Sequence, residues 1–353
     1  MSFQQTSPTI SQEVINAIEN SSLEFKFRQS NEKAWQESCN KLSYCPIFYE
    51  NIYIDYQLAY QRFHGGNWHD ISILIFNNHE AVGIWPLTFS FDGNVCNLTS
   101  NGSPITEPLF FKNTPKKLVK SSTSKCIDLM LKIKDIISLN EILCFSPFLN
   151  NINISNWQTL IMERGASTIV DYNLYINLLE PIEEIKSNFR KSYKSLINPS
   201  KYNYSLAVMN ASDDEAIWKS FQEFHINVSG RITRSQKTWD LQYLAIKKNK
   251  AFLVYLLDKN SNLIGGAYIM HSNTEGLYFS GVYDRSLSHE PLSHIIQFQT
   301  IQELQSRGCS WYKLGHRHYQ MDRIKPTEKE LAISFFKEGF SSYVTPSYNL
   351  KID

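Results

Sequence analysis

Two stretches of the chain show the same pattern of apolar and polar residues. Residues 71–89 (ISILIFNNHEAVGIWPLTF) contain an apolar run, a polar turn and a second apolar run, and residues 251–270 (AFLVYLLDKNSNLIGGAYIM) repeat that order. Apolar runs rich in β-branched and aromatic residues on both sides of a polar loop are typical of a β-hairpin. A third apolar run follows each hairpin, at 94–99 and at 276–283. Each stretch therefore predicts three consecutive antiparallel strands.

The segments that follow the predicted strands also correspond. A helical stretch is expected at 122–139 in the first half and at 289–307 in the second, although glutamines blur the apolar periodicity of the latter. A short apolar strand follows in each half, at 141–146 and at 310–315. The same order of elements in both halves indicates a duplicated unit.

The closing segments of the two halves are alike as well. Residues 162–174 (MERGASTIVDYNL) are similar to residues 337–350 (KEGFSSYVTPSYNL), and Gly165 and Gly339 stand in matching places. A structural repeat of about half the chain explains this similarity and agrees with a length of 353 residues, which suits two domains.

The boundary between the halves is predicted from a helix that joins them. Pro181 suits the first turn of a helix, and Pro199 disfavours helix in the residue before it. We therefore expect a linking helix between these prolines. The predicted domains are residues 1–180 and residues 181–353, and the second carries most of the candidate site residues.

Composition excludes some classes of function. Hydrophobic residues make up 42% of the chain and charged residues 20%, as in an ordinary folded protein with buried cores. Lys and Arg (35) almost balance Asp and Glu (34), so no general charge favours DNA, RNA or an acidic membrane. The six cysteines show no CxxC pair and no partnering histidine spacing, which predicts neither a zinc site nor a disulfide framework. We expect no metal and no DNA partner.

The apolar pattern also gives an expectation about location. Residues 1–13 (MSFQQTSPTISQE) lack the basic-then-apolar order of a signal peptide. No stretch reaches about 18 uninterrupted apolar residues, the length that indicates a transmembrane helix. A cytoplasmic protein without a transmembrane segment is therefore expected.

The order of elements leads to a resemblance. A strand, two helices, three antiparallel strands, a helix, a strand, a helix and a last strand is the order of GNAT-fold acyltransferases. Two such units in tandem, with GSPITEPLF (102–110) in the first and WYKLG…LAISFFKEGF (311–340) closing the second, resemble the Fem-type family. The resemblance covers roughly residues 25–350, and its most specific part is a strand, a glycine, a helix and the phrase FK-x-GF. It implies an α/β fold of two tandem GNAT-like units.

The resemblance also implies an activity. The Fem-type family includes transferases that build peptidoglycan cross-bridges, and it has relatives in cell-surface polysaccharide loci. It therefore implies transfer of an acyl or aminoacyl group to an amine of a sugar or cell-envelope precursor. No permanently bound cofactor is implied, because the donor is a substrate, either an acyl coenzyme A or an aminoacyl-tRNA.

Two departures from the family leave the donor open. Many cross-bridge enzymes carry a long helical hairpin that grasps tRNA, and this chain has no room for such a coiled-coil arm between residues 200 and 250. GNAT enzymes hold the coenzyme A pyrophosphate on a glycine-rich loop at a helix N-terminus. The corresponding stretch, 283–296, contains no glycine, and 101–117 lacks the motif too. A near-neutral net charge disfavours tRNA, whose binding normally needs several phosphate contacts.

The connection between the last two predicted strands contains the first candidate site residues. Gly315 lets the chain turn at the end of a strand and lets a ligand approach closely. Lys329 and Lys337 recur along one helix face, while Leu331 and Phe335 are expected on the buried face. The resemblance implies that a lysine here, matched by Lys337, stabilises the oxyanion that forms when an amine attacks a carbonyl. A solvated surface lysine is the alternative.

Two histidines and a glutamate of the same connection are also considered. His316 and His318 would point to opposite sides of an extended chain, so at most one of them, here His316, is assigned to the cleft. Thr327 and Glu330 have the spacing of a capping box. This makes Glu330 a helix-start residue rather than a catalytic base.

Residues 223–239 (EFHINVSGRITRSQKTW) bring further candidates together. This connection lines the acceptor side of a GNAT cleft, and Fem-type enzymes often have an arginine here. A guanidinium group holds a phosphate or carboxylate through two parallel hydrogen bonds. Arg231 is preferred for anion binding, with Arg234 beside it. His225 is a candidate general base, and a packed helix histidine is the alternative.

Two more candidates carry simpler alternatives. Lys186, Arg190 and Lys194 recur every four residues of the linking helix, which marks either a solvated face or a site for the diphosphate of a nucleotide-linked or lipid-linked sugar. Asp284 and Tyr283 end a middle strand, where they would position the acceptor amine. A turn-forming aspartate is the alternative.

Two functions follow from these residues. The leading hypothesis is an N-acyltransferase with Lys337, His225 and Asp284 in catalytic roles. The alternative is a non-catalytic module that binds carbohydrate or protein on a degenerate GNAT fold, which the missing glycine loop favours.

Overall fold

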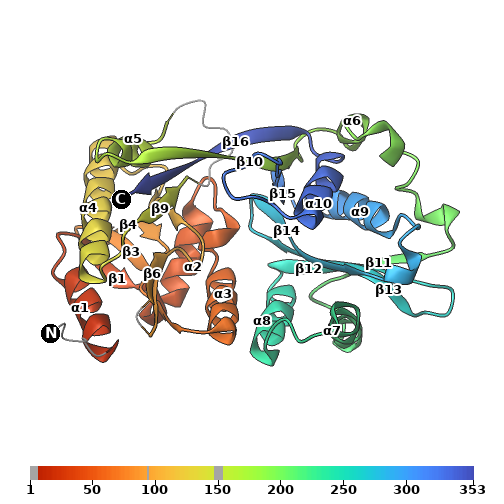
Figure 1. Cartoon of the computed structure of the whole chain (residues 1–353), viewed down its shortest axis with the longest axis horizontal. Coiled ribbons are helices and arrows are strands. Elements are labelled where there is room, and N and C mark those ends of the chain that lie inside the picture. The colour runs from red at the N-terminus through yellow and green to blue at the C-terminus, as the bar shows by residue number, and fades with distance from the viewer. Residues whose placement is uncertain (1–6, 94, 147–153) are drawn as a thin grey trace. The chain divides into compact units, whose positions relative to one another are not determined.

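The computed structural model describes residues 7–93, 95–146 and 154–353 (Figure 1). The chain forms two compact units: unit 1 consists of Met1–Val170 and Ser347–Asp353, and unit 2 consists of Asp171–Pro346. This division differs from the predicted one after residue 180. Strand β10 (Ser167–Asn177) starts in unit 1 and ends in unit 2, and strand β16 (Tyr343–Ile352) starts in unit 2 and ends in unit 1. Among the described helices, none is long and apolar enough to cross a bilayer.

Unit 1 contains five helices and nine complete strands among its described residues. The helices are α1 (Ser7–Glu19), α2 (Glu32–Lys41), α3 (Asn51–His64), α4 (Lys116–Ile136) and α5 (Asn156–Met162). The strands are β1 (Glu24–Phe27), β2 (Asn67–Asp70), β3 (Ile73–Asn77), β4 (Glu80–Trp85), β5 (Thr88–Asp92), β6 (Val95–Thr99), β7 (Ile105–Thr106), β8 (Leu109–Phe110) and β9 (Ile142–Phe145).

The three consecutive strands predicted in the first half do not form a single antiparallel sheet. β3 and β4 form the predicted hairpin within the sheet β1-β3-β4-β8. The third predicted strand, 94–99, pairs with β5 in the separate sheet β2-β5-β6, and Asn94 lies outside the described residues. Pro86 stands between β4 and β5. Because proline cannot donate a hydrogen bond to a strand ladder, the chain leaves the first sheet at this point.

Unit 2 has the predicted order of elements. The helices are α6 (Ile182–Ser187), α7 (Ala216–Ser229), α8 (Gln236–Lys247), α9 (Leu292–Ser306) and α10 (Glu328–Glu338). The strands are β11 (Ser205–Met209), β12 (Ala251–Leu257), β13 (Leu263–His271), β14 (Glu275–Tyr283) and β15 (Trp311–His316). Between residues 200 and 250, all of which are described, no helical arm is inserted between α7 and α8.

The sheet of unit 2 is covered on both faces. Its strands follow the order β11-β12-β13-β14-β15-β10. Helices α7 and α8 lie on one face, and α9 and α10 lie on the other (Figure 1). Strands buried on both sides are apolar along their whole length, which explains the uninterrupted runs of β12 and β13. Phe252, Val254 and Ile269 are fully buried there.

Strands β14 and β15 separate within the sheet. In the described strands, the parallel pairing of β14 with β15 covers Glu275–Leu277 and Trp311–Lys313, although β14 continues to Tyr283 and β15 to His316. Beyond this point β14 stays paired with β13, and β15 with β10. A gap therefore opens between two central strands of the sheet.

The linking helix is shorter than predicted. Helix α6 ends at Ser187 instead of continuing toward Pro199. Arg190 is extended, and its backbone N–H donates to the carbonyl of Gly339 at 2.8 Å. This contact after α10 overrides the helical preference of the segment. Lys186, Arg190 and Lys194 therefore do not share a helix face.

Candidate functional site

Lys337 lies in the last turn of α10, and its ammonium group reaches the gap between β14 and β15. Nζ is 5.0 Å from the centre of the Tyr278 ring, and Tyr278 follows the last residue of β14 that pairs with β15. Nζ also borders Gly315 of β15, where a Cβ atom would lie 3.3 Å from it. Gly315 has a φ of +113°, which L side chains rarely adopt. The backbone conformation at this position therefore favours glycine, and any side chain here would crowd the Lys337 ammonium group.

The charge of Lys337 is not neutralised by the protein. Within the described residues no carboxylate forms an ion pair with it, and burial lowers the pKa of Lys337 from 10.5 to about 8. Loss of water disfavours the charged form of an amine, which explains the direction of the shift. At neutral pH the ammonium form still predominates. A fixed cation without a counter-charge thus lies where negative charge on a bound ligand would be stabilised.

Helix α10 begins as predicted, but its buried and exposed residues differ from those predicted. Thr327 and Glu330 form the capping box. Lys329 is exposed, so its spacing from Lys337 does not bring both lysines into one environment. Phe335, expected to be buried, is exposed and lies 3.9 Å under the guanidinium of Arg190. The short polar side chain of Ser334 is buried instead.

Two tyrosines that follow the separation of the strands extend the site. The hydroxyl groups of Tyr278 and Tyr283 are 3.1 Å apart, and burial raises the pKa of both, so both remain protonated. A side chain at Gly281 would overlap the Tyr278 hydroxyl. Tyr278 was not identified from the sequence, because a break in the register of β14 between Tyr278 and Ser280 interrupts the alternation of faces along this strand.

His316, the last residue of β15, and His318 do not point apart. Their ring centres lie 5.9 Å from each other. Side chains two residues apart in an extended chain lie on the same side, so the prediction that these two point to opposite sides is wrong. His316 remains exposed, yet loss of water around the ring lowers its pKa. The charge of Asp171 opposes this shift, and His318 and Lys337 add to it. His316 therefore lies near Lys337 and is neutral at neutral pH.

A second unneutralised cation lies on the opposite face of the sheet of unit 2. Arg234 is 8% exposed, and its guanidinium group is 4.5 Å from the Trp239 ring centre. Nη1 donates to Oε1 of Gln242 at 3.0 Å. In the described part of the chain Nε has no hydrogen-bond partner and no carboxylate pairs with Arg234. Buried charges are usually paired, so this arrangement favours an external anion.

His225 and Arg231, the other two candidates of residues 223–239, lie in different environments. His225 packs 5.3 Å from the Trp239 ring, and burial, followed by the charge of Arg234, lowers its pKa to about 4. This placement is that of a packed helix histidine and makes His225 a weak base. Arg231, preferred for anion binding by the sequence analysis, is exposed. Trp239 and Gln242, which hold the guanidinium, were not identified from the sequence.

The last two candidates lie outside these two environments. Asp284 accepts hydrogen bonds from the backbone N–H and the hydroxyl of Ser286, at 2.9 and 2.7 Å. It thus shapes the turn after β14, as in the alternative left open by the sequence. Lys194 lies beyond the end of α6, and its Nζ donates to the carbonyl of Ser187 at 2.7 Å.

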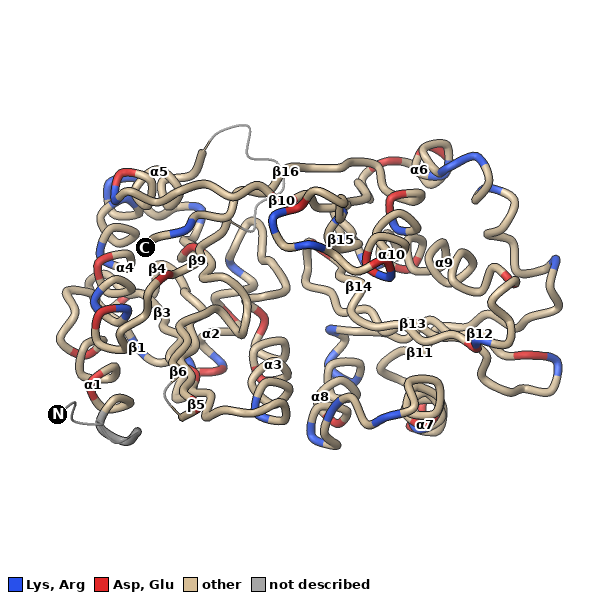
Figure 2. Tube along the Cα trace, in the orientation of Figure 1, with Lys and Arg blue, Asp and Glu red and all other residues tan. Residues whose placement is uncertain are grey.

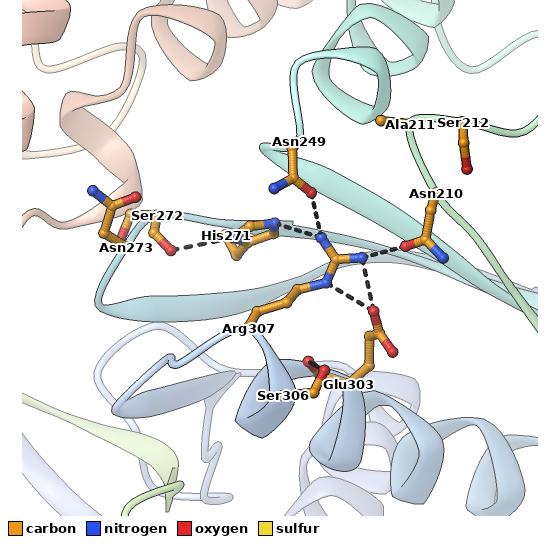
Figure 3. A pocket seen from close by; sticks show the side chains of 10 residues that line it. All are labelled: Asn210, Ala211, Ser212, Asn249, His271, Ser272, Asn273, Glu303, Ser306 and Arg307. Carbon is orange, nitrogen blue, oxygen red and sulfur yellow. Dashed lines mark hydrogen bonds and ion pairs between the residues drawn. The ribbon is translucent and has the colours of Figure 1, made fainter.

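A polar pocket of about 610 Å³ near the turn between β13 and β14 provides an internal contrast. Figure 3 shows Arg307 in its centre, with every N–H group directed at a neighbour. Nε and Nη2 bind Glu303, Nη1 binds Asn249 and His271, and Nη2 also binds Asn210. Arg307 thus joins α9 to β13 and to the segments that follow β11 and α8. Because the protein satisfies this guanidinium completely, it has no donor left for a ligand.

Comparisons with known proteins show the fold. No family model matches the chain, and no curated protein matches it in sequence. The crystal structure of FemX matches 92% of this chain and 97% of its own, with a TM-score of 0.66 and 11% identity. L-PGS from Bacillus licheniformis matches 83% of this chain and 90% of its own, with a TM-score of 0.53 and 11% identity.

A conserved protein of unknown function from Bacteroides thetaiotaomicron is also similar. It matches 94% of this chain and 100% of its own, with a TM-score of 0.55 and 10% identity. These likenesses cover both units of the chain. The chain therefore has the fold of the Fem-type proteins, two GNAT-like units in tandem, and its described residues contain no coiled-coil arm.

Proposed function

We propose that the protein is an N-acyltransferase whose reaction takes place in the gap between β14 and β15 of unit 2. The observation that carries this proposal is Lys337, a partly buried ammonium group without a counter-charge at the point where the strands separate. A cation held in this way gains most when negative charge appears in the transition state. The shared fold with FemX and with L-PGS supports the same class of reaction.

The proposed step transfers an acyl or aminoacyl group to an amine. The amine nitrogen bonds to the carbonyl carbon, and the oxygen becomes an oxyanion that Lys337 stabilises. The intermediate then loses the C–S bond of an acyl coenzyme A or the C–O bond of an aminoacyl-tRNA. The proton released by the amine ends on the leaving sulfur or oxygen. Gly315 leaves room for the reacting carbonyl, and the protonated hydroxyl of Tyr278 lies beside this path.

The acceptor is proposed to carry an anionic group. Arg234 is buried, stacks on Trp239 and keeps Nε without a partner among the described residues, which suits a phosphate or carboxylate. An amine of a sugar or cell-envelope precursor, linked to a nucleotide or lipid, meets this requirement. His225 and Asp284 receive no acid–base role here, because the first is enclosed by Trp239 and Phe221 and the second holds a turn.

A transfer assay tests the proposal. The wild-type chain is incubated with an acyl coenzyme A or with charged tRNA and a panel of amino-sugar nucleotides, and products are analysed by mass spectrometry. The expected result is an acceptor whose mass increases by the acyl group. Absence of product with both donors, together with retained binding of a sugar nucleotide, would instead favour the non-catalytic binding module.

A further inference from the structure

A cavity of about 430 Å³ in unit 2 is separate from the proposed reaction site. It lies between the segment 186–206 and helix α9. Three of its lining residues are lysines, Lys186, Lys194 and Lys201, and neither Lys337 nor Arg234 lines it. Figure 2 shows the basic positions of the segment that follows α6. The cavity is within the size range of small-molecule sites.

The charges of this cavity are not balanced by its own lining. No aspartate or glutamate lines it, and all of its lining residues are described. Nζ of Lys194 donates to the carbonyl of Ser187 at 2.7 Å, and Nζ of Lys201 donates to the carbonyl of Ser195 at 3.4 Å. These bonds restrain the ammonium groups without neutralising them. Lys186 has a partner, the exposed Glu183 at 3.6 Å.

Like charges gathered in one cavity repel each other, and an anion that binds between them removes this repulsion.

Arg190, which the sequence grouped with these lysines, does not contribute. Its guanidinium lies over Phe335 and donates to the carbonyl of that residue at 3.1 Å. The cationic group is therefore made of lysines, which bind phosphate as point charges.

The rest of the lining contains apolar side chains and the amide groups of two glutamines. Ile197 and Ile295 are buried, and Phe298 of α9 is half-buried. Gln299 and Gln302, also on α9, complete this part of the lining. These two residues are among the glutamines that blur the apolar periodicity of this helix. A wall of this kind accommodates a flat ring, while the amides donate to and accept from polar groups on its edge.

We propose that this cavity binds a nucleoside diphosphate, with its phosphates at Lys194 and Lys201 and its base against Phe298. The lysines alone would suit any small polyanion, but the apolar wall and the two glutamines favour a ligand that also carries a base. The diphosphate belongs either to a free nucleotide or to coenzyme A, which contains the same group. The proposal concerns binding and does not depend on acyl transfer.

Isothermal titration calorimetry at low ionic strength tests this site with ADP, coenzyme A, pyrophosphate and adenosine as probes. We expect ADP to bind, pyrophosphate to bind more weakly and adenosine to bind weakest. Binding of coenzyme A as tight as that of ADP assigns the diphosphate to the acyl carrier, and weaker binding assigns it to a free nucleotide. Added salt weakens ADP binding because exposed charges are screened. No saturable binding of ADP at millimolar concentration would overturn the proposal.

Two matched double variants locate the site. Lys194→Gln with Lys201→Gln is expected to weaken ADP binding by at least about 10-fold, the effect of losing a hydrogen bond to a charged group. Lys237→Gln with Lys259→Gln removes two exposed lysines of unit 2 outside the cavity and is expected to leave binding unchanged. Equal losses in both variants would mean non-specific attraction and would refute the site.

A third variant tests the base. Gln302 is exposed, so Gln302→Ala is expected to preserve the fold. It should weaken ADP binding while leaving pyrophosphate binding unchanged. Equal binding of ADP and pyrophosphate to the wild type would contradict a nucleoside-binding wall. Thermal unfolding of every variant confirms that the protein is folded in each titration.

Discussion

Each unit contains a buried arginine, and the two arginines differ in whether a carboxylate balances their charge. In unit 1, Arg28 is 2% exposed and donates to Asp70 at 2.7 Å, to Asp55 at 2.7 Å and to Asn51 at 2.8 Å. In unit 2, Arg234 is almost as buried but has an amide and an indole ring around it instead of carboxylates. Two copies of one fold therefore use the same side chain for different purposes. Arg28 is balanced by the protein, whereas Arg234 has a charge that remains available to a ligand.

The difference is not a general property of unit 2. Arg307 in the same unit has a full set of partners, including the carboxylate of Glu303. Two other cations of unit 2 that are buried or partly buried have no carboxylate partner, Arg234 beside Trp239 and Lys337 at the gap between β14 and β15. Because an unpaired buried charge destabilises a protein, a functional reason for keeping it is required. The comparison thus supports the proposed site by an argument that does not use the fold.

Removal of Arg28 should have the largest effect on stability. Arg28→Met leaves the buried carboxylate of Asp70 and the partly exposed carboxylate of Asp55 without their cation. Breaking a buried pair in this way typically costs about 3–5 kcal/mol. The free energy of unfolding from chemical denaturation measures this loss. A cost below about 1 kcal/mol would show that the network around Arg28 contributes little and would weaken the comparison.

The conservative change Arg234→Lys should act on binding. Lysine keeps the charge but loses the planar fork and the stacking on Trp239, so the affinity for an anionic acceptor is expected to fall by about 10-fold or more. Arg231→Lys is the matched control, since Arg231 is exposed in the same connection. Acceptor titrations compare the two variants. A larger loss of acceptor affinity in Arg231→Lys would assign the anion site to Arg231, as the sequence predicts.

In contrast to Arg28, Arg234 should not be needed for folding. Arg234→Met removes a buried charge that has no carboxylate to leave behind, so the free energy of unfolding is expected to change by less than about 1 kcal/mol or to rise. Denaturation under the same conditions as for Arg28→Met gives a direct comparison. If both variants lost several kcal/mol, the two arginines would have the same structural role.

The smallest expected effect is a pH dependence of stability. Because folding lowers the pKa of Lys337 from 10.5 to about 8, the unfolded chain binds more protons between these pH values, and stability should rise with pH in this window. Lys337→Met lacks this contribution. The difference in unfolding free energy between wild type and variant, measured below pH 8 and near pH 10.5, should therefore shift in favour of the wild type. A constant difference would argue against a buried ammonium group.

The sequence predicts the local elements of unit 2 well because local signals specify them. Alternating apolar runs and a polar turn predict the hairpin of β12 and β13, and the spacing of Thr327 and Glu330 predicts the start of α10. The linking helix was predicted too long because a tertiary contact, from Arg190 to Gly339, competes with helix formation. In unit 1, Pro86 sends the next strand into another sheet, which apolar periodicity alone does not show.

The site itself was predicted in part. The phrase around Lys337 identified the residue, but its burial and its contact with Tyr278 depend on the separation of two strands. The choice between Arg231 and Arg234 could not be made from spacing. It depends on which side chain reaches Trp239 and Gln242, eight residues or fewer away in the chain but on the next helix. Burial of a charge is a tertiary property, and here it distinguishes the candidates.

The most direct test of the account compares two lysines of α10. Lys337→Met preserves the apolar stem of the side chain and removes the charge, and Lys329→Met makes the same change at an exposed position. The rate of acyl transfer is measured at saturating donor and acceptor, with thermal stability recorded for each protein. The account predicts a roughly 100- to 1000-fold loss of turnover for Lys337→Met and less than about a twofold change for Lys329→Met. Normal turnover in folded Lys337→Met would contradict a role for this cation in the reaction.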